Sequence, residues 1–152
     1  MKPSDKIKER RFETFINTTK AANLKLTHQR LEIFREIAVS DEHPDVDTIF
    51  KRVRKRVPTI SHDTVYRTFT FLEKRGLLSK VSLFSDRARF DPNPEPHHHV
   101  VCIKCGSVKD IYYNLPVSFK IPEDIQNWGK INTVYIELRG ICRKCRPENE
   151  LE

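Results

Sequence analysis

Apolar residues recur at helical spacing through the first half of the chain. Four stretches show this pattern, with apolar positions three or four residues apart: residues 5–25, 26–40, 43–58 and 61–75. Such a stripe is typical of an amphipathic helix that packs one face against a core. The pattern therefore predicts four helices that pack through their apolar faces.

The ends of these helices are marked by residues that satisfy or interrupt backbone hydrogen bonds. Thr27 and Ser61 stand at N-cap positions, where a side-chain oxygen accepts a hydrogen bond from an amide of the first turn. Pro44 fits the first turn of the third helix, and Pro58 ends that helix. Gly76 is expected just past the end of the fourth helix, because glycine adopts the left-handed conformation needed there.

After Gly76 the pattern predicts two short strands joined by a turn at residues 84–86. Helices followed by a hairpin, with a basic capped helix just before it, is the order of a winged helix. In such a domain helix 61–75 would enter the DNA major groove. Its first turns would expose His62, Asp63, Thr64, Tyr66 and Arg67. The alternative is a helical domain that docks onto another protein.

The second part of the chain has a different pattern. Residues 91–96 hold three prolines and predict a stiff linker. Strand-like stretches follow, and Pro122 could open a short helix between the last two of them. The sequence thus predicts an α+β protein with a winged-helix domain at 1–90, a hinge at 91–96 and a small α/β domain at 97–150.

The positive charge of the chain is concentrated in the winged-helix part. Residues 1–90 contain 20 Lys and Arg against 12 Asp and Glu, whereas residues 91–152 contain 8 against 9. The excess favours a polyanion such as DNA as the partner of the first domain. Solvated helix faces would also account for the charge, so it supports the DNA interpretation without deciding it.

No stretch approaches the ~18 apolar residues that a membrane helix requires. The first residues, "MKPSDKIKERRF", lack the apolar segment of a secretory signal. We therefore expect a cytoplasmic protein.

The four cysteines form two identical pairs, Cys102-x-x-Cys105 and Cys142-x-x-Cys145. A disulfide framework is one interpretation, but the cytosol keeps thiols reduced. Two such pairs together supply the four thiolates of a closed tetrahedral Zn²⁺ shell. The spacing therefore favours a structural zinc site built from two separate strand ends.

A second group of metal-capable side chains lies around the linker. His97 and His99 would share one face of a strand, with His98 pointing away. Imidazoles and carboxylates together suit Fe²⁺ or Mn²⁺, with Zn²⁺ also possible. The full candidate set comes from both predicted domains: His43, Asp91, His97, His99 and Asp110. The alternative is a helix cap at His43, a turn residue at Asp91 and a solvent-exposed histidine run.

Taken together, six motifs resemble the ferric uptake regulator (Fur) family. They occur in order over roughly residues 20–146: "LKLTHQRLEIF", "HPDVDTIFKRV", "ISHDTVYRTFTFLEKRGLL", "RARFDPN", "HHHVVCIKCG" and "GICRKC". This resemblance implies a homodimeric, metal-dependent transcriptional repressor with a C-terminal dimerisation domain, and not an enzyme.

The resemblance also implies a role for individual residues. It places structural zinc on the four cysteines and the regulatory Fe²⁺ or Mn²⁺ on the five histidine and aspartate residues named above. It assigns the DNA contacts to the helix at 61–75 and to one lysine before the second helix: Ser61, Thr64, Tyr66, Arg67 and Lys25.

Within the family the chain is most similar to the peroxide-sensing (PerR) subfamily. Aspartate stands at both carboxylate positions, Asp91 and Asp110, where iron-uptake members typically carry glutamate. This similarity implies that peroxide, reacting with bound Fe²⁺, oxidises His43 or His97. The alternative is an iron, manganese or zinc uptake regulator of the same family.

Two further classes of function are compatible with the residues. A His/carboxylate metal centre could turn over a small substrate, but no separate base or nucleophile cluster accompanies it. A metal-storage or zinc-binding interaction module is the other, and absent or salt-insensitive DNA binding would favour it.

Overall fold

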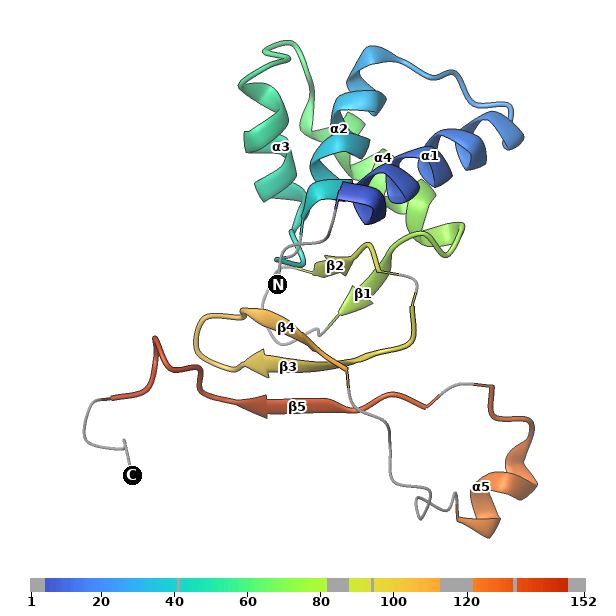
Figure 1. Cartoon of the computed structure of the whole chain (residues 1–152), viewed down its shortest axis with the longest axis vertical. Coiled ribbons are helices and arrows are strands. Elements are labelled where there is room, and N and C mark those ends of the chain that lie inside the picture. The colour runs from blue at the N-terminus through green and yellow to red at the C-terminus, as the bar shows by residue number, and fades with distance from the viewer. Residues whose placement is uncertain are drawn as a thin grey trace. The chain divides into compact units, whose positions relative to one another are not determined.

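The computed structural model describes residues 5–40, 42–81, 88–93, 95–112, 122–132 and 134–147. The chain forms two compact units, Met1–Pro94 and Glu95–Glu152, and each has its own elements (Figure 1). In the described part of the chain, every helix is too short or too polar to cross a membrane.

The first unit contains the four expected helices. They are α1 (Asp5–Ala21), α2 (His28–Val39), α3 (Val46–Arg54) and α4 (His62–Lys74). The predicted N-caps are confirmed: the Thr27 side chain accepts a hydrogen bond from the Arg30 amide, and Ser61 accepts one from Thr64. Gly76 follows α4 with a φ of 70°, so the predicted left-handed residue after that helix is also confirmed.

The apolar faces of these helices form one core. Phe15 of α1 and Phe34 of α2 are buried, with ring centroids 5.4 Å apart. Phe69 of α4 packs edge-on against Phe90, at 4.9 Å. Burying each such ring contributes roughly 1.5–3 kcal/mol to folding. The core therefore holds the hairpin strand that carries Phe90 firmly against α4.

The predicted start of the third helix was wrong. α3 begins at Val46 and not at Pro44, because the Asp45 side chain accepts a hydrogen bond from the Thr48 amide at 2.6 Å and caps the helix there. Pro44 lies before the cap. His43, the residue before it, has a φ of 50°, in the left-handed region that residues other than glycine seldom adopt.

The predicted hairpin is present as two antiparallel strands, β1 (Ser79–Val81) and β2 (Arg89–Asp91). Ser79 pairs with Asp91, so Asp91 lies at the open end of the hairpin, where the linker begins. The predicted turn at residues 84–86 lies outside the described residues.

The second unit contains a three-stranded sheet of order β4-β3-β5. The central strand β3 (His98–Cys102) is antiparallel to β4 (Val108–Ile111) and parallel to β5 (Glu137–Gly140). The short helix expected near Pro122 is α5 (Glu123–Trp128). The parallel pairing of β3 with β5 brings the chain that follows both strands to the same end of the sheet.

Candidate metal centres

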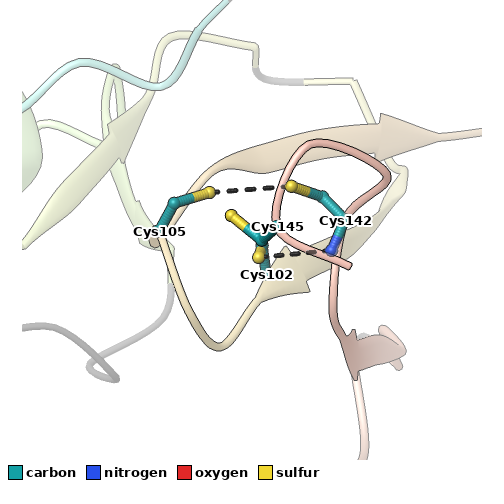
Figure 2. Close-up of side chains that lie close together, drawn as sticks. All are labelled: Cys102, Cys105, Cys142 and Cys145. Carbon is teal, nitrogen blue, oxygen red and sulfur yellow. Dashed lines mark hydrogen bonds between the residues drawn. The ribbon is translucent and has the colours of Figure 1, made fainter. Parts of the chain in front are cut away.

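The four cysteines gather at one end of the β4-β3-β5 sheet. Cys102 ends β3, and Cys105 lies in the turn that follows; Cys142 and Cys145 lie in the turn after β5. Cys102 pairs with Gly140 in the parallel register, so the two turns lie side by side. Figure 2 shows the four side chains converging on one small space.

The distances between the sulfur atoms match a tetrahedral metal site. All four sulfurs lie within 4.8 Å of one another, and the Sγ atoms of Cys105 and Cys142 are 3.8 Å apart. A tetrahedron with Zn–S bonds of ~2.3 Å has edges of ~3.8 Å. A disulfide needs sulfurs at ~2.05 Å, and all four cysteines are free. The residues therefore fit Zn²⁺ and not a pair of disulfides.

Backbone amides around the cluster favour thiolates. The Cys142 N–H donates to Cys102 Sγ at 3.3 Å, and this bond is the main cause that lowers the pKa of Cys102 to about 6. Ser107 lowers the pKa of Cys105. Hydrogen bonding with the neighbouring sulfurs, first that of Cys142, raises the pKa of Cys145 to about 12. The pKa values of these three thiols are therefore shifted in opposite directions, and a divalent cation bound by the four cysteines would convert all of them to thiolates.

In the first unit, His43 and Asp91 form a buried pair. The Phe90 N–H donates to the Pro44 carbonyl at 3.2 Å, which holds the chain before α3 against β2. His43 Nε2 thereby lies 3.7 Å from Asp91 Oδ1, with both side chains 3% exposed or less. The Asn93 N–H donates to Asp91 Oδ1 at 2.8 Å and orients the carboxylate. A buried carboxylate beside an imidazole suits a divalent metal.

In the second unit, His97, His99 and Asp110 form a second cluster. The antiparallel register pairs His99 with Asp110. The Nε2 atoms of His97 and His99 are 2.9 Å apart, and they lie 3.5 and 3.7 Å from Asp110 Oδ1. His97 and His99 therefore lie on the same face, as the sequence predicts.

The backbone fixes which nitrogen of His97 can bind a metal. His97 Nδ1 lies 2.6 Å from the Glu95 carbonyl oxygen, which only accepts hydrogen bonds. Nδ1 is therefore the donor in this contact, and Nε2 is the nitrogen directed at His99 and Asp110. Metal-binding histidines usually donate from their other ring nitrogen in this way, which fixes the orientation of the ring.

His98 differs from its two neighbours. Its Nδ1 accepts a hydrogen bond from the Ile136 N–H at 3.1 Å, just before β5. This agrees with the expectation that His98 points away from the other two histidines. Its partner is a backbone amide, which no side-chain motif could have revealed.

Sequence reasoning missed Tyr112. The Tyr112 hydroxyl donates to Asp110 Oδ2 at 3.3 Å, and its ring centroid lies 5.7 Å from that of His97. A signal was available, because residues two apart in an extended chain share a face and Tyr112 is two residues after Asp110.

Comparison with known proteins decides the family. A model of the ferric uptake regulator family matches residues 21–139. The chain belongs to this family. Fur-family members are metal-responsive transcriptional repressors that bind DNA as dimers, and they are not enzymes.

Among curated Fur-family proteins, the chain is similar to the peroxide-responsive repressor PerR of Staphylococcus epidermidis. The two are 28% identical over 138 residues, which is 90% of this chain and 91% of the relative. This identity supports the family assignment.

Two solved structures show the same fold. The ferric uptake regulator of Helicobacter pylori has a TM-score of 0.70 at 24% identity, with 93% of this chain and 95% of that chain covered. A zinc-bound manganese uptake regulator has a TM-score of 0.62 at 27% identity, with 85% and 98% covered. The predicted fold class is confirmed: an N-terminal winged-helix DNA-binding domain with a small C-terminal α/β dimerisation domain.

The helix expected to read DNA in this Fur-family chain presents two of its candidate contacts to solvent. Tyr66 is 58% exposed, and the exposed Arg67 guanidinium pairs with Asp63 at 2.8 Å one turn earlier. Ser61 and Thr64 are engaged with each other in the helix cap, their hydroxyls 2.8 Å apart. Outside this helix, Lys25 is exposed just before α2.

Proposed function

We propose that the chain is a homodimeric, metal-dependent transcriptional repressor that senses peroxide through oxidation of a ligand histidine. It would act in the cytoplasm, with double-stranded operator DNA as partner, structural Zn²⁺ on the four cysteines, and regulatory Fe²⁺ or Mn²⁺. The working division is a DNA-binding domain at 1–90, a hinge at 91–96 and a metal-binding dimerisation domain at 97–150.

The observation that carries this proposal is the cluster of His97, His99 and Asp110. Two imidazole nitrogens and a carboxylate oxygen within 3.7 Å of one another form a donor set for Fe²⁺ or Mn²⁺ and not for a thiolate-type zinc site. Aspartate at positions 91 and 110 is the feature in which the chain resembles the peroxide-sensing subfamily.

We propose further that one metal ion takes ligands from both units. His43 and Asp91 would complete its coordination together with the three residues of the second unit. A metal shared in this way would favour one arrangement of the DNA-binding domains over the others. Losing the metal would then lower DNA affinity by a population shift, with no change of fold in either unit.

The peroxide step requires a redox-active metal; the histidine and aspartate ligands would hold Fe²⁺, which when bound could supply electrons to the peroxide. Zn²⁺ has no such step. In the proposal, His43 and His97 would hold the metal through imidazole nitrogen, which would bring their rings close to the oxidant. Oxidation would weaken them as ligands and release the operator.

The test is anaerobic loading with Fe²⁺, a brief peroxide pulse and peptide mass spectrometry. Trypsin separates the two histidines, with His43 in peptide 36–51 and His97 in peptide 90–104. One added oxygen on either peptide, with iron and not with Mn²⁺, is the expected result. Absence of added oxygen would contradict peroxide sensing.

The alternative is a metal-uptake regulator without peroxide chemistry. The likeness to a manganese uptake regulator at 27% identity favours considering it. It predicts that DNA binding follows metal concentration and that the peptides above gain no oxygen after the pulse.

A further inference from the structure

Tyr112 completes a four-residue surface on the sheet of the second unit. The antiparallel register pairs His98 with Ile111 and His99 with Asp110, so it places Tyr112 opposite His97 when extended by one residue. Because alternate residues share a face, Tyr112 lies on the same face of the sheet as Asp110. His97 and His99 lie on that face too, at the paired positions of the neighbouring strand.

Two contacts join Tyr112 to the proposed metal ligands. Its hydroxyl donates to Asp110 Oδ2 at 3.3 Å, while the other carboxylate oxygen, Oδ1, faces the two histidines. Its ring is inclined at 31° to the His97 ring, with centroids 5.7 Å apart. The phenol therefore touches one ligand through its oxygen and another through its ring.

Tyr112 is also open to solvent and chemically suited to oxidation. It is 70% exposed, so peroxide that reaches this cluster from solvent meets the phenol as well as the histidines. A phenol ring is richer in electrons than an imidazole bound to a cation, and its carbons beside the hydroxyl are easily oxidised. Because its hydroxyl contacts Asp110 and its ring lies beside that of His97, Tyr112 is close to any oxidant that forms at these two residues.

We propose that Tyr112 is a second site of oxidative modification, which competes with the ligand histidines for the oxidant. This inference rests on the proposed peroxide function. In the overall reaction, peroxide converts a ring C–H group beside the Tyr112 hydroxyl to C–OH. The C–H bond and the O–O bond break, the ring loses two electrons to the peroxide, and the second oxygen leaves as water. The product is a catechol. Each oxidant consumed by Tyr112 is one fewer that can oxidise a ligand histidine.

Peptide mass spectrometry separates this inference from the proposed function. After the iron and peroxide treatment above, Tyr112 falls in peptide 110–120 and His97 in peptide 90–104. We expect one added oxygen on peptide 110–120 in the Fe²⁺-loaded protein and none in the Mn²⁺-loaded protein. Fragment ions must assign that oxygen to Tyr112 and not to Tyr113.

Variants test the competition. Tyr112→Leu should raise the oxidised fraction of peptide 90–104, since one acceptor of the oxidant is gone. The exposed position makes this change harmless to the core, and retained zinc is the check on folding. The matched control is Tyr135→Leu at another exposed tyrosine, in peptide 131–139, which should leave the distribution unchanged.

The outcomes differ for the two proposals. Added oxygen on His43 or His97 with none on Tyr112 overturns the inference and leaves peroxide sensing standing. The same conclusion follows if the oxidised fraction of peptide 90–104 is unchanged in the Tyr112→Leu variant. No oxygen on any of these peptides overturns both. Iron-dependent oxygen on Tyr112, with more histidine oxidation in the Tyr112→Leu variant, supports both.

Discussion

Single side chains of the second unit owe their different chemistry to the backbone groups beside them. Three consecutive histidines show this. The Glu95 carbonyl accepts a hydrogen bond from His97 Nδ1, so Nε2 is the nitrogen directed at His99 and Asp110, whereas His98 Nδ1 accepts a hydrogen bond from the Ile136 amide. Neighbouring histidines therefore have different hydrogen-bond partners, which makes paired substitutions informative.

We expect His97→Ala to reduce regulatory-metal affinity by at least about tenfold, since even residues that only hydrogen-bond to a metal ligand are worth that much. The control is His98→Asn, because the asparagine carbonyl can accept the same hydrogen bond from Ile136. Metal affinity by competition with a chelator is the measurement. Equal affinities in the two variants would remove His97 from the ligand set.

Cys102→Ser should abolish structural zinc binding and with it the fold of the second unit or the dimer, because a structural metal contributes folding free energy directly. Zinc content, circular dichroism and sedimentation together report the effect. Ile103→Ser, at an exposed position in the same turn, is the control and should keep zinc. A stable, zinc-loaded Cys102→Ser dimer would refute the assignment.

The site residues differ in how far the sequence could predict them. The cysteine cluster was predictable because its spacing encodes the chemistry, and the structure brings the four sulfurs together. Tyr112 was predictable in principle from strand alternation. The hydrogen bond of His98 was not, since it depends on the parallel pairing of β3 with β5, which are far apart in the sequence.

At the level of elements, local capping decides where the helices begin. The caps at Thr27 and Ser61 followed from the sequence, because a cap depends on a few adjacent residues. At the third helix two start signals competed, and Asp45 prevailed over Pro44 because its carboxylate gains a hydrogen bond from the Thr48 amide.

Ser61→Ala should therefore lower the free energy of unfolding of the protein by about 1 kcal/mol, since the hydrogen bond to the Thr64 amide is lost. Urea unfolding of the variant measures this. Thr59→Ala, in the exposed loop just before α4, is the control and should change little. An unchanged free energy of unfolding in Ser61→Ala would show that the α4 cap adds no stability.

α2 is tied to the end of α3 by Glu32. This buried carboxylate accepts a hydrogen bond from Arg56 Nε at 2.8 Å and also pairs with Arg35. The hydrogen bond from Arg56 is the main cause that lowers the pKa of Glu32 below its ordinary value of 4.5. A lowered pKa means that the tie stabilises the fold above about pH 4.5 and is lost as the pH falls through the folded value.

Glu32→Gln should cost roughly 1–3 kcal/mol at neutral pH, because charge-assisted hydrogen bonds are replaced by weaker ones. The difference from wild type should shrink as the pH falls below the pKa of an ordinary carboxyl group. Urea unfolding at several pH values gives both results. The control is Glu13→Gln, on an exposed part of α1, which should leave stability nearly unchanged. A loss of stability in Glu32→Gln that is the same at every pH would contradict the role of Glu32.

At the scale of the whole molecule, the order of the elements along the chain is enough to predict the fold class. Helices followed by a hairpin, and then a cysteine-bearing sheet, are the order that the chain adopts. The sheet order β4-β3-β5 could not be predicted in the same way, because a parallel pair between distant strands leaves no local signal.

The central claim is that a metal on the histidine and aspartate residues controls DNA binding. It is tested by selecting duplexes from a random pool with the Mn²⁺-loaded protein and then measuring anisotropy with and without a chelator that spares the cysteine-bound zinc. We predict about 5- to 150-fold weaker DNA binding without Mn²⁺, restored by adding it back, and no such response in His97→Ala. Equal binding with and without the metal in the wild-type protein would contradict the account.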